Sequence, residues 1–102
     1  MQSFITTKQT EIIELCRTHH VRRLSVFGSA VRDDFDPATS DIDVRVEFHP
    51  AAIDDYVRNL EDLHDSLTKL FGRKVDLLSA QEIRNPRLRK IIEEAQVTLY
   101  AA

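Results

Sequence analysis

The segment Leu24–Phe48 reads LSVFGSAVRDDFDPATSDIDVRVEF: an apolar run, a turn, a polar loop and an alternating run. The first run predicts a strand over residues 24–27 that ends at Gly28-Ser29, where a missing side chain lets backbone N–H groups approach an anion. A short helix over residues 30–32 would add its dipole to this anion site. The segment therefore predicts a turn shaped for phosphate directly after a strand.

The second run, Asp41–Phe48, alternates polar and apolar residues, which is the period of a β-strand. We expect the apolar side chains to enter the core and the polar ones to share the opposite face. The apolar set is Ile42, Val44, Val46 and Phe48, and the polar set is Asp41, Asp43, Arg45 and Glu47. The carboxylates of Asp41 and Asp43 would project in parallel, about 7 Å apart at the backbone, close enough to share one or two hard cations. A DxD pair facing a Gly-Ser turn therefore predicts a nucleoside triphosphate bound through Mg²⁺.

The remaining sequence predicts helices and strands that would support this unit. The expected elements are a helix capped by Thr7, a long amphipathic helix over residues 53–71 ended by Gly72, a strand over 74–78, a helix opened by Asn85-Pro86, and a strand or tail over 97–100. Cys16 is expected to be a small buried residue, and His64 an exposed residue on the polar side of the long helix.

Asp76 is an acid among apolar neighbours in the short strand after the long helix. A structural role would pair it with Arg73 or Lys74. A functional role would make it a third carboxylate beside Asp41 and Asp43, in a set that binds ions and accepts the proton of an attacking hydroxyl. Both interpretations stay open from the residues alone.

The composition indicates one small domain over residues 1–102, because 102 residues with 42% hydrophobic content leave no room for a second core. A net charge of −3, from 14 basic and 17 acidic residues, argues against non-specific nucleic-acid binding. One cysteine allows no internal disulfide, no stretch has the length and purity of a membrane span, and the start does not read as a signal peptide. We therefore expect a cytoplasmic protein.

Three motifs together resemble the minimal nucleotidyltransferase (MNT) family of the DNA polymerase beta superfamily. They are Phe27-Gly28-Ser29, Ser40-Asp41-Ile42-Asp43, and Asp76 within VDLL. The resemblance covers nearly the whole chain, and the joint pattern is specific where each motif alone is not. It implies an α/β (α+β) fold, a polymerase-beta-like nucleotidyltransferase core with a short mixed sheet flanked by helices.

The resemblance also implies roles for the residues at matching positions. The implied nucleotide-binding residues are Gly28, Ser29 and Arg32. The implied catalytic residues are Asp41, Asp43 and Asp76, of which the first two resemble the Mg²⁺ ligands. The third resembles the acid that assists deprotonation of the acceptor and would complete the metal-binding set. One or two Mg²⁺ ions would be the cofactor, with ATP as substrate.

Two features depart from the family pattern. The loop between Ser29 and Asp41 is one residue longer than the commonest family spacing, which a surface loop absorbs at little cost. Arg45 lies on the carboxylate face, where it would either bind phosphate or pair with Glu47 or Asp41 and weaken metal binding.

The implied function is transfer of AMP from ATP to a hydroxyl on a partner protein, with release of pyrophosphate. Members this short resemble antitoxins encoded beside HEPN-domain RNase toxins, so the implied partner is a separate HEPN-type toxin chain, in a homo- or hetero-oligomer that the sequence leaves open. One alternative is a non-catalytic antitoxin that inhibits its partner by complex formation. Another is a small-molecule nucleotidyltransferase, although such enzymes usually need an added domain for the acceptor. A DxD-type glycosyltransferase would need a longer chain and would not explain the Gly-Ser turn.

Overall fold

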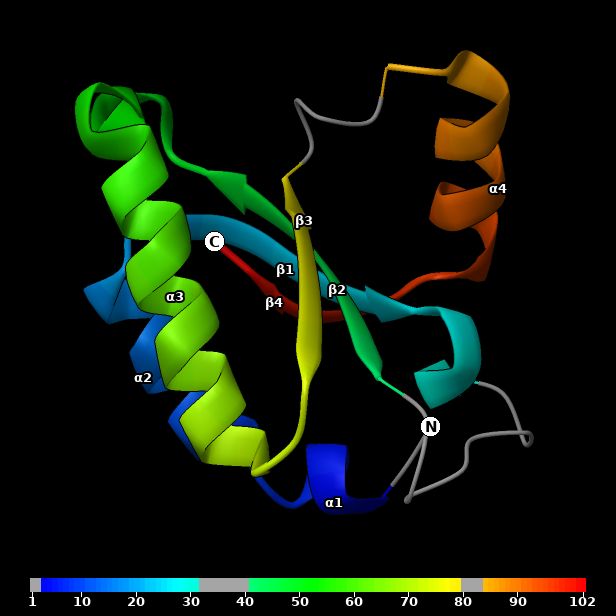
Figure 1. The fold of residues 1–102 in the computed structure, drawn as a ribbon, viewed down its shortest axis with the longest axis horizontal. Coiled ribbons are helices and arrows are strands. Elements are labelled where there is room, and N and C mark those ends of the chain that lie inside the picture. Colours follow the sequence, from blue (N-terminus) through cyan, green and yellow to red (C-terminus); the bar gives the residue numbers. More distant parts are fainter. Residues whose placement is uncertain (1–2, 32–40, 80–83) are drawn as a thin grey trace.

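A four-stranded mixed sheet is the centre of the molecule in the computed structural model, which describes residues 3–31, 41–79 and 84–102 (Figure 1). The strands are β1 (Val21–Phe27), β2 (Ile42–Phe48), β3 (Val75–Ser79) and β4 (Val97–Ala101), in the spatial order β3-β2-β1-β4. β1 runs antiparallel to β2 and β4, whereas β3 runs parallel to β2. The predicted fold class, a short mixed sheet flanked by helices, is confirmed.

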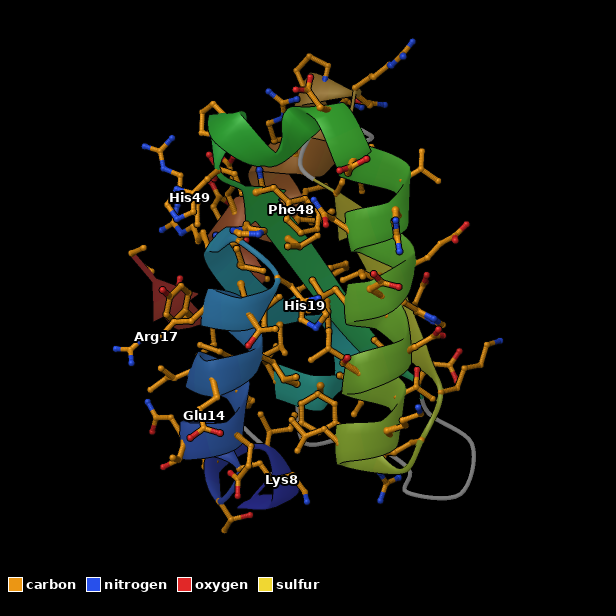
Figure 2. All side chains as sticks on the ribbon, turned by 90° about the vertical axis from the view of Figure 1, so that its left-hand side faces the viewer. Lys8, Glu14, Arg17, His19, Phe48 and His49 are labelled. Carbon is orange, nitrogen blue, oxygen red and sulfur yellow. The ribbon has the colours of Figure 1, made fainter. Side chains whose placement is uncertain are left out.

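The two longest helices on one face of the sheet are α2 (Gln9–Thr18) and α3 (Tyr56–Phe71), which lie side by side (Figure 2). His19, directly after α2, lies between them, with Nε2 3.2 Å from Oγ of Ser66. A single helical turn, α1 (Ser3–Thr6), precedes α2, and the described residues also include the 3₁₀ helices η1 (Gly28–Val31) and η2 (Pro50–Asp55). The last helix, α4 (Pro86–Ala95), lies on the other side of the sheet and contacts η1 (Figure 1).

The alternation of β2 separates a core face from a polar face, as the sequence predicts. Ile42, Val44 and Val46 are completely buried, whereas Asp43 and Arg45 between them are partly exposed. Val44 and Val46 pair with Val26 and Leu24 of β1, and this apolar surface packs against α2 and α3. Burying each such side chain contributes about 1.5–3 kcal/mol, so the core fixes which face of β2 carries the acids.

Two expected helix starts are wrong by a few residues. α2 begins at Gln9 with Lys8 in the N-cap position and no side-chain cap, so Thr7 is not its N-cap. The long helix does not start at residue 53, because the chain first makes the 3₁₀ helix η2, which Pro50 opens with its fixed φ, and α3 follows from Tyr56.

The first strand starts at Val21, three residues before the expected start at residue 24, and the expected short helix over residues 30–32 is the 3₁₀ helix Gly28–Val31. The strand expected over 74–78 is shifted by one residue. The end of the long helix and the start of the last helix are confirmed at Gly72 and Asn85-Pro86. Gly72 ends α3 at φ +64°, in the left-handed region that glycine adopts at helix ends. Asn85 caps α4, since its Oδ1 accepts hydrogen bonds from the backbone N–H groups of Arg87 at 2.9 Å and Leu88 at 3.4 Å. The final segment is the strand β4.

Two single residues complete the comparison with the sequence. Cys16 is fully buried, as expected, and burial raises the pKa of its thiol to about 12. The His64 side chain is about half-exposed, in partial agreement with the expected exposed histidine, and its Nε2 lies 2.9 Å from the carbonyl oxygen of Val75. Over the described parts of the chain, no helix combines the length and apolar character needed to cross a membrane.

Candidate active site

Asp43 and Asp76 are direct neighbours on the polar face of the sheet. β2 and β3 pair in parallel with Asp43 opposite Asp76, and side chains at paired positions point to the same face. Adjacent strands lie about 4.8 Å apart, so the two carboxylates share one small region of surface. Asp43 is partly exposed and Asp76 is exposed, so both face solvent instead of the core.

The turn after β1 lies directly against the Asp43 carboxylate. Gly28 has φ +68°, a conformation that residues with side chains rarely adopt. A Cβ at this position would collide with Oδ2 of Asp43 and lie 3.3 Å from its Cγ. Position 28 therefore requires glycine for two reasons: the positive φ angle and the close approach of the Asp43 carboxylate. Ser29 follows in η1 and is partly exposed.

This closeness gives the site a definite chemical preference. A phosphate bound by the backbone N–H groups of the Gly28-Ser29 turn would lie beside the Asp43 carboxylate, and two anions in contact repel one another. A divalent cation between them removes the repulsion, and Mg²⁺ takes one or two protein carboxylates together with phosphate oxygens. The donor set of Asp43, Asp76 and a bound phosphate therefore suits Mg²⁺.

Asp41 directly precedes β2 and forms an ion pair with a lysine. Its Oδ2 lies 3.7 Å from Nζ of Lys74, while the backbone N–H of Ile42 donates to the Lys74 carbonyl at 3.1 Å. The side chains of Lys74 and Asp41 are 79% and 41% exposed, so solvent screens their attraction and a stronger partner can replace the lysine.

The protein does not preform a complete metal cage in the segments that the structure describes. No three His, Cys, Asp or Glu side chains of residues 3–31, 41–79 and 84–102 are grouped closely enough to hold an ion by themselves. Ligands from a nucleotide would have to complete the coordination, as is usual for Mg²⁺.

Arg45 connects the polar face of the sheet to α4. Its Nη1 donates to Oε1 of Gln96 at 3.2 Å, and its Nη2 lies 3.4 Å from Oε1 of Glu93. The Arg45 side chain is only 14% exposed, whereas Glu93 is 48% exposed, so the contact is buried on the arginine side and open to water on the glutamate side. The sequence suggests Glu47 or Asp41 as its ion-pair partner, but Glu47 lies 3.7 Å from Arg22, and Asp41 pairs with Lys74. The arginine therefore holds α4 and leaves the acids to other partners.

The structure brings most of the predicted site residues together. The Gly28-Ser29 turn lies against Asp43, and Asp43 lies opposite Asp76. Asp41 lies at the same end of β2. The structural alternative for Asp76 finds no support, because Lys74 pairs with Asp41, and Asp76 has no ion pair within the described ranges. Arg32 lies outside the described residues. The Arg45 contacts could not be read from the sequence, because they join residues about fifty positions apart.

Comparison with protein families and single relatives gives concordant matches. The model of the family described as "Nucleotidyltransferase domain" matches residues 10–98. Two proteins of Methanocaldococcus jannaschii, both named "Putative protein adenylyltransferase", are 38% and 37% identical to the chain over 93 residues, which cover 83% of this chain and 91% of each relative.

Solved structures with the same fold include a "putative minimal nucleotidyltransferase", with a TM-score of 0.69 and 28% identity over 91% of this chain and 90% of that one. A toxin–antitoxin complex with AMP-PNP matches with a TM-score of 0.64 and 20% identity, over 92% of this chain and 73% of that one. A Shewanella oneidensis complex of a tri-AMPylated HEPN toxin with an MNT antitoxin matches with a TM-score of 0.60 and 18% identity, over 95% and 72% of the two chains. At such identities these two complexes show a shared fold.

Proposed function

The chain belongs to the nucleotidyltransferase domain family and is a minimal nucleotidyltransferase, and from this premise we propose that it transfers AMP from ATP to a hydroxyl group of a separate HEPN-type toxin, and so acts as an antitoxin. We further propose that residues 1–102 form a single catalytic domain and that the reaction takes place in the cytoplasm, where ATP is supplied.

One observation carries this proposal: the parallel register that sets Asp43 beside Asp76, with Gly28 against the Asp43 carboxylate. It supports the proposal because the Gly28-Ser29 turn and two carboxylates then share one solvent-facing surface, as phosphoryl transfer requires. A purely structural sheet has no need for two neighbouring carboxylates there, because like charges on paired positions destabilise the strands.

The proposed reaction is an in-line displacement at the α-phosphorus of ATP. The acceptor oxygen forms a bond to that phosphorus, the bond from it to the pyrophosphate oxygen breaks, and the hydroxyl proton passes to the Asp76 carboxylate. The backbone N–H groups of Gly28 and Ser29 orient the triphosphate, and Asp41 and Asp43 are the residues that would hold the cation. Mg²⁺, when bound, neutralises the charge of the triphosphate and of the departing pyrophosphate.

Relatives support the choice of nucleotide and acceptor. The M. jannaschii relatives are named as protein adenylyltransferases, which supports AMP as the transferred group and a protein as the acceptor. Two structures with the same fold are toxin–antitoxin complexes, one with AMP-PNP and one with an AMPylated HEPN toxin, which supports ATP and a HEPN partner.

The test is transfer of label from [α-³²P]ATP to a HEPN-domain protein of the same genome, in the presence of Mg²⁺, with intact mass spectrometry to identify an AMP adduct. We expect the wild-type chain to label its partner and the Asp43→Asn and Asp76→Asn variants to lose at least about 100-fold in rate, because each removes a group that acts on the reacting atoms. Glu47→Gln is the matched control, since Glu47 lies on the same face of β2 but pairs with Arg22 at the far end.

Two outcomes would contradict the enzymatic proposal. One is labelling that the Asp43→Asn and Asp76→Asn variants preserve. The other is full inhibition of the partner RNase by those variants without any AMP transfer, which would indicate an antitoxin that works by complex formation.

A further inference from the structure

Among the described residues, no strand lies beside the outer edge of the strand that carries Asp76. β3 is the end strand of the sheet, and within the described ranges it pairs only with β2. The Lys74 carbonyl accepts from Ile42, so it points towards β2, and the alternation of a strand turns the main-chain groups of Val75, Leu77 and Ser79 to the outer side. Such an edge is a template for another strand.

His64 protects one end of this edge. The Val75 carbonyl can only accept, so Nε2 of His64 donates to it at 2.9 Å, and the imidazole occupies the place that an incoming strand would take. The outward-facing residue next along β3 is Leu77, whose main chain has no such cap from the residues that the structure describes. Pairing with another chain is therefore directed to the part of β3 that begins beside Asp76.

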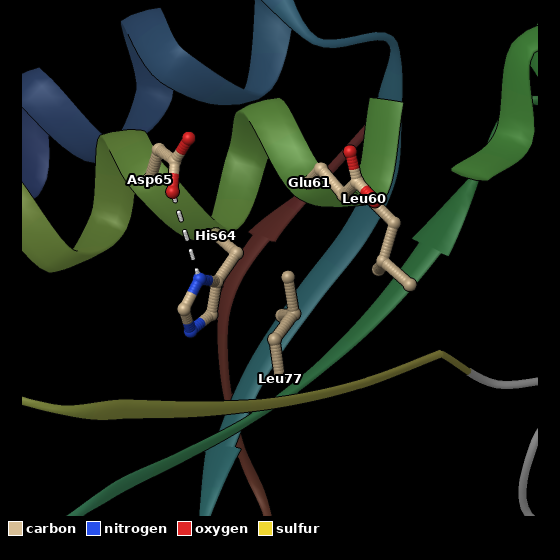
Figure 3. Close-up of a pocket in the computed structure, with 5 residues that line it drawn as sticks. All are labelled: Leu60, Glu61, His64, Asp65 and Leu77. Atoms are coloured by element: carbon tan, nitrogen blue, oxygen red, sulfur yellow. Dashed lines mark ion pairs between the residues drawn. The ribbon is translucent and has the colours of Figure 1, made fainter. Parts of the chain in front are cut away.

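A pocket lies beside the same part of the edge, between β3 and α3 (Figure 3). Its volume is about 450 Å³, and its apolar wall is formed by Leu60 and Leu77 with the ring of His64 beside them. The carboxylates of Glu61 and Asp65 form a rim on the helix side. The pocket has room for one large apolar side chain, and its rim favours a basic neighbour.

Asp76 and Leu77 are consecutive, so their side chains leave opposite faces of β3. Leu77 lines the pocket beside α3, whereas Asp76 lies next to Asp43 on the polar face of the sheet. A strand added along the outer edge would follow the same alternation. One of its residues would point to Asp76, and the next would point into the pocket.

We propose that the acceptor protein presents its hydroxyl on an extended segment that pairs with the outer edge of β3 at Leu77. This inference rests on the proposed function and specifies its acceptor. The hydroxyl-bearing residue points towards Asp76, the adjacent residue places a large apolar side chain between Leu60 and Leu77, and a basic residue nearby meets Glu61 and Asp65. Main-chain hydrogen bonds give affinity, and the pocket gives specificity, as in other cases of strand addition.

Synthetic peptides test this assignment. The parent peptide carries a tyrosine next to a leucine, with arginine beyond it, and AMP transfer from ATP is measured as kcat/KM. We expect replacement of the leucine by serine to lower kcat/KM about tenfold or more, because the pocket then loses its apolar occupant. N-methylation along the peptide should reduce transfer about tenfold at alternate residues only, since alternate N–H groups face β3.

Charge reversal on α3 gives a test with a matched control. Glu61→Lys should lower kcat/KM for the arginine-containing peptide about fivefold, because it removes an attraction at the pocket rim. Asp62→Lys makes the same change of charge one residue away, at an exposed position that does not line the pocket, and should leave kcat/KM within about twofold. Both variants should bind Mg²⁺ and AMP-PNP as the wild type does, measured by titration calorimetry.

The outcomes separate this inference from the proposed function. If the wild type labels the HEPN partner but not the peptides, or labels peptides regardless of the leucine, or loses activity uniformly along the N-methyl series, the edge assignment is overturned and the nucleotidyl transfer stands. Equal effects of Glu61→Lys and Asp62→Lys would also overturn it. If neither partner nor peptide is labelled while AMP-PNP binds, the proposed function fails and this inference fails with it.

Discussion

Replacing Gly28 by alanine tests whether the Asp43 carboxylate lies against the turn. The new methyl group would meet Oδ2 of Asp43, so the carboxylate would have to rotate away from its position beside Asp76. The substitution also places alanine at φ +68°. Gly72 provides the control, since it has φ +64° but nothing within 4 Å of a Cβ.

Comparing the two glycines separates the free-energy cost of the left-handed backbone from the cost of the collision with Asp43. Gly72→Ala should cost about 1 kcal/mol, the penalty of a left-handed backbone for an L-residue. Gly28→Ala should cost about 2 kcal/mol, because forcing the Asp43 side chain off its rotamer adds about 1 kcal/mol. In an Asp43→Ala background the colliding atoms are absent, so the cost of Gly28→Ala should fall to that of Gly72→Ala. The resulting coupling energy is about 1 kcal/mol.

Urea unfolding followed by circular dichroism measures these values, provided that the m-values of the variants agree. Transfer of AMP should respond more strongly than stability. A misplaced carboxylate at the reacting centre costs about 100-fold in rate, whereas Gly72→Ala should leave the rate within about twofold. Equal stability losses for Gly28→Ala and Gly72→Ala, with no coupling to Asp43→Ala, would refute the placement of the carboxylate on the turn.

Three further predictions concern the scaffold. Burial raises the pKa of the Cys16 thiol to about 12 in the folded protein, so as pH rises the thiol loses its proton first in the unfolded protein, and stability falls from about pH 9. Relative to Cys16→Ala, the wild type should therefore lose about 1 kcal/mol of unfolding free energy between pH 8 and pH 10, measured by urea unfolding. Arg45→Ala should destabilise by about 1–2 kcal/mol in the same assay because it removes a mostly buried side chain with two polar partners, whereas Arg22→Ala, at an exposed side chain, should cost less than about 0.5 kcal/mol. Asn85→Ala should lower the free energy of unfolding by about 1 kcal/mol and increase hydrogen exchange in the first turn of α4, because it removes the cap. Equal losses for the two arginine variants, a Cys16→Ala profile parallel to that of the wild type, or unchanged exchange in α4 would contradict these predictions.

Local patterns in the sequence were sufficient for most elements. The strict alternation of β2, the Asn85-Pro86 start of α4 and the Gly72 end of α3 each depend on neighbouring residues only, and each is confirmed. The helix starts at Gln9 and Tyr56 were missed because the chain makes a short turn before each helix, for which the apolar period gives no signal.

Contacts between residues far apart in the sequence could not be predicted from local sequence patterns. Arg45 meets Glu93 and Gln96 only because α4 returns to the polar face of the sheet, and His64 meets Val75 only because α3 crosses to β3. The combination of motifs, and not any period, predicted that Asp76 would approach the DxD pair. The register now places it beside Asp43, while the catalytic and metal-binding roles of these residues stay predictions.

The same alternation that builds the core also fixes the acids of β2. Sliding β2 by one residue against β1 would turn Ile42, Val44 and Val46 to the polar face and Asp43 and Arg45 into the core. Each apolar side chain would lose about 1.5–3 kcal/mol of burial, and the buried charges would add further cost, so the total exceeds the stability of a typical small domain. The position of Asp43 is therefore as well determined as the core itself. Asp76 depends on the shorter strand β3, which is an end strand of the sheet as β4 is, so a partner that pairs with β3 would also hold that strand in its register.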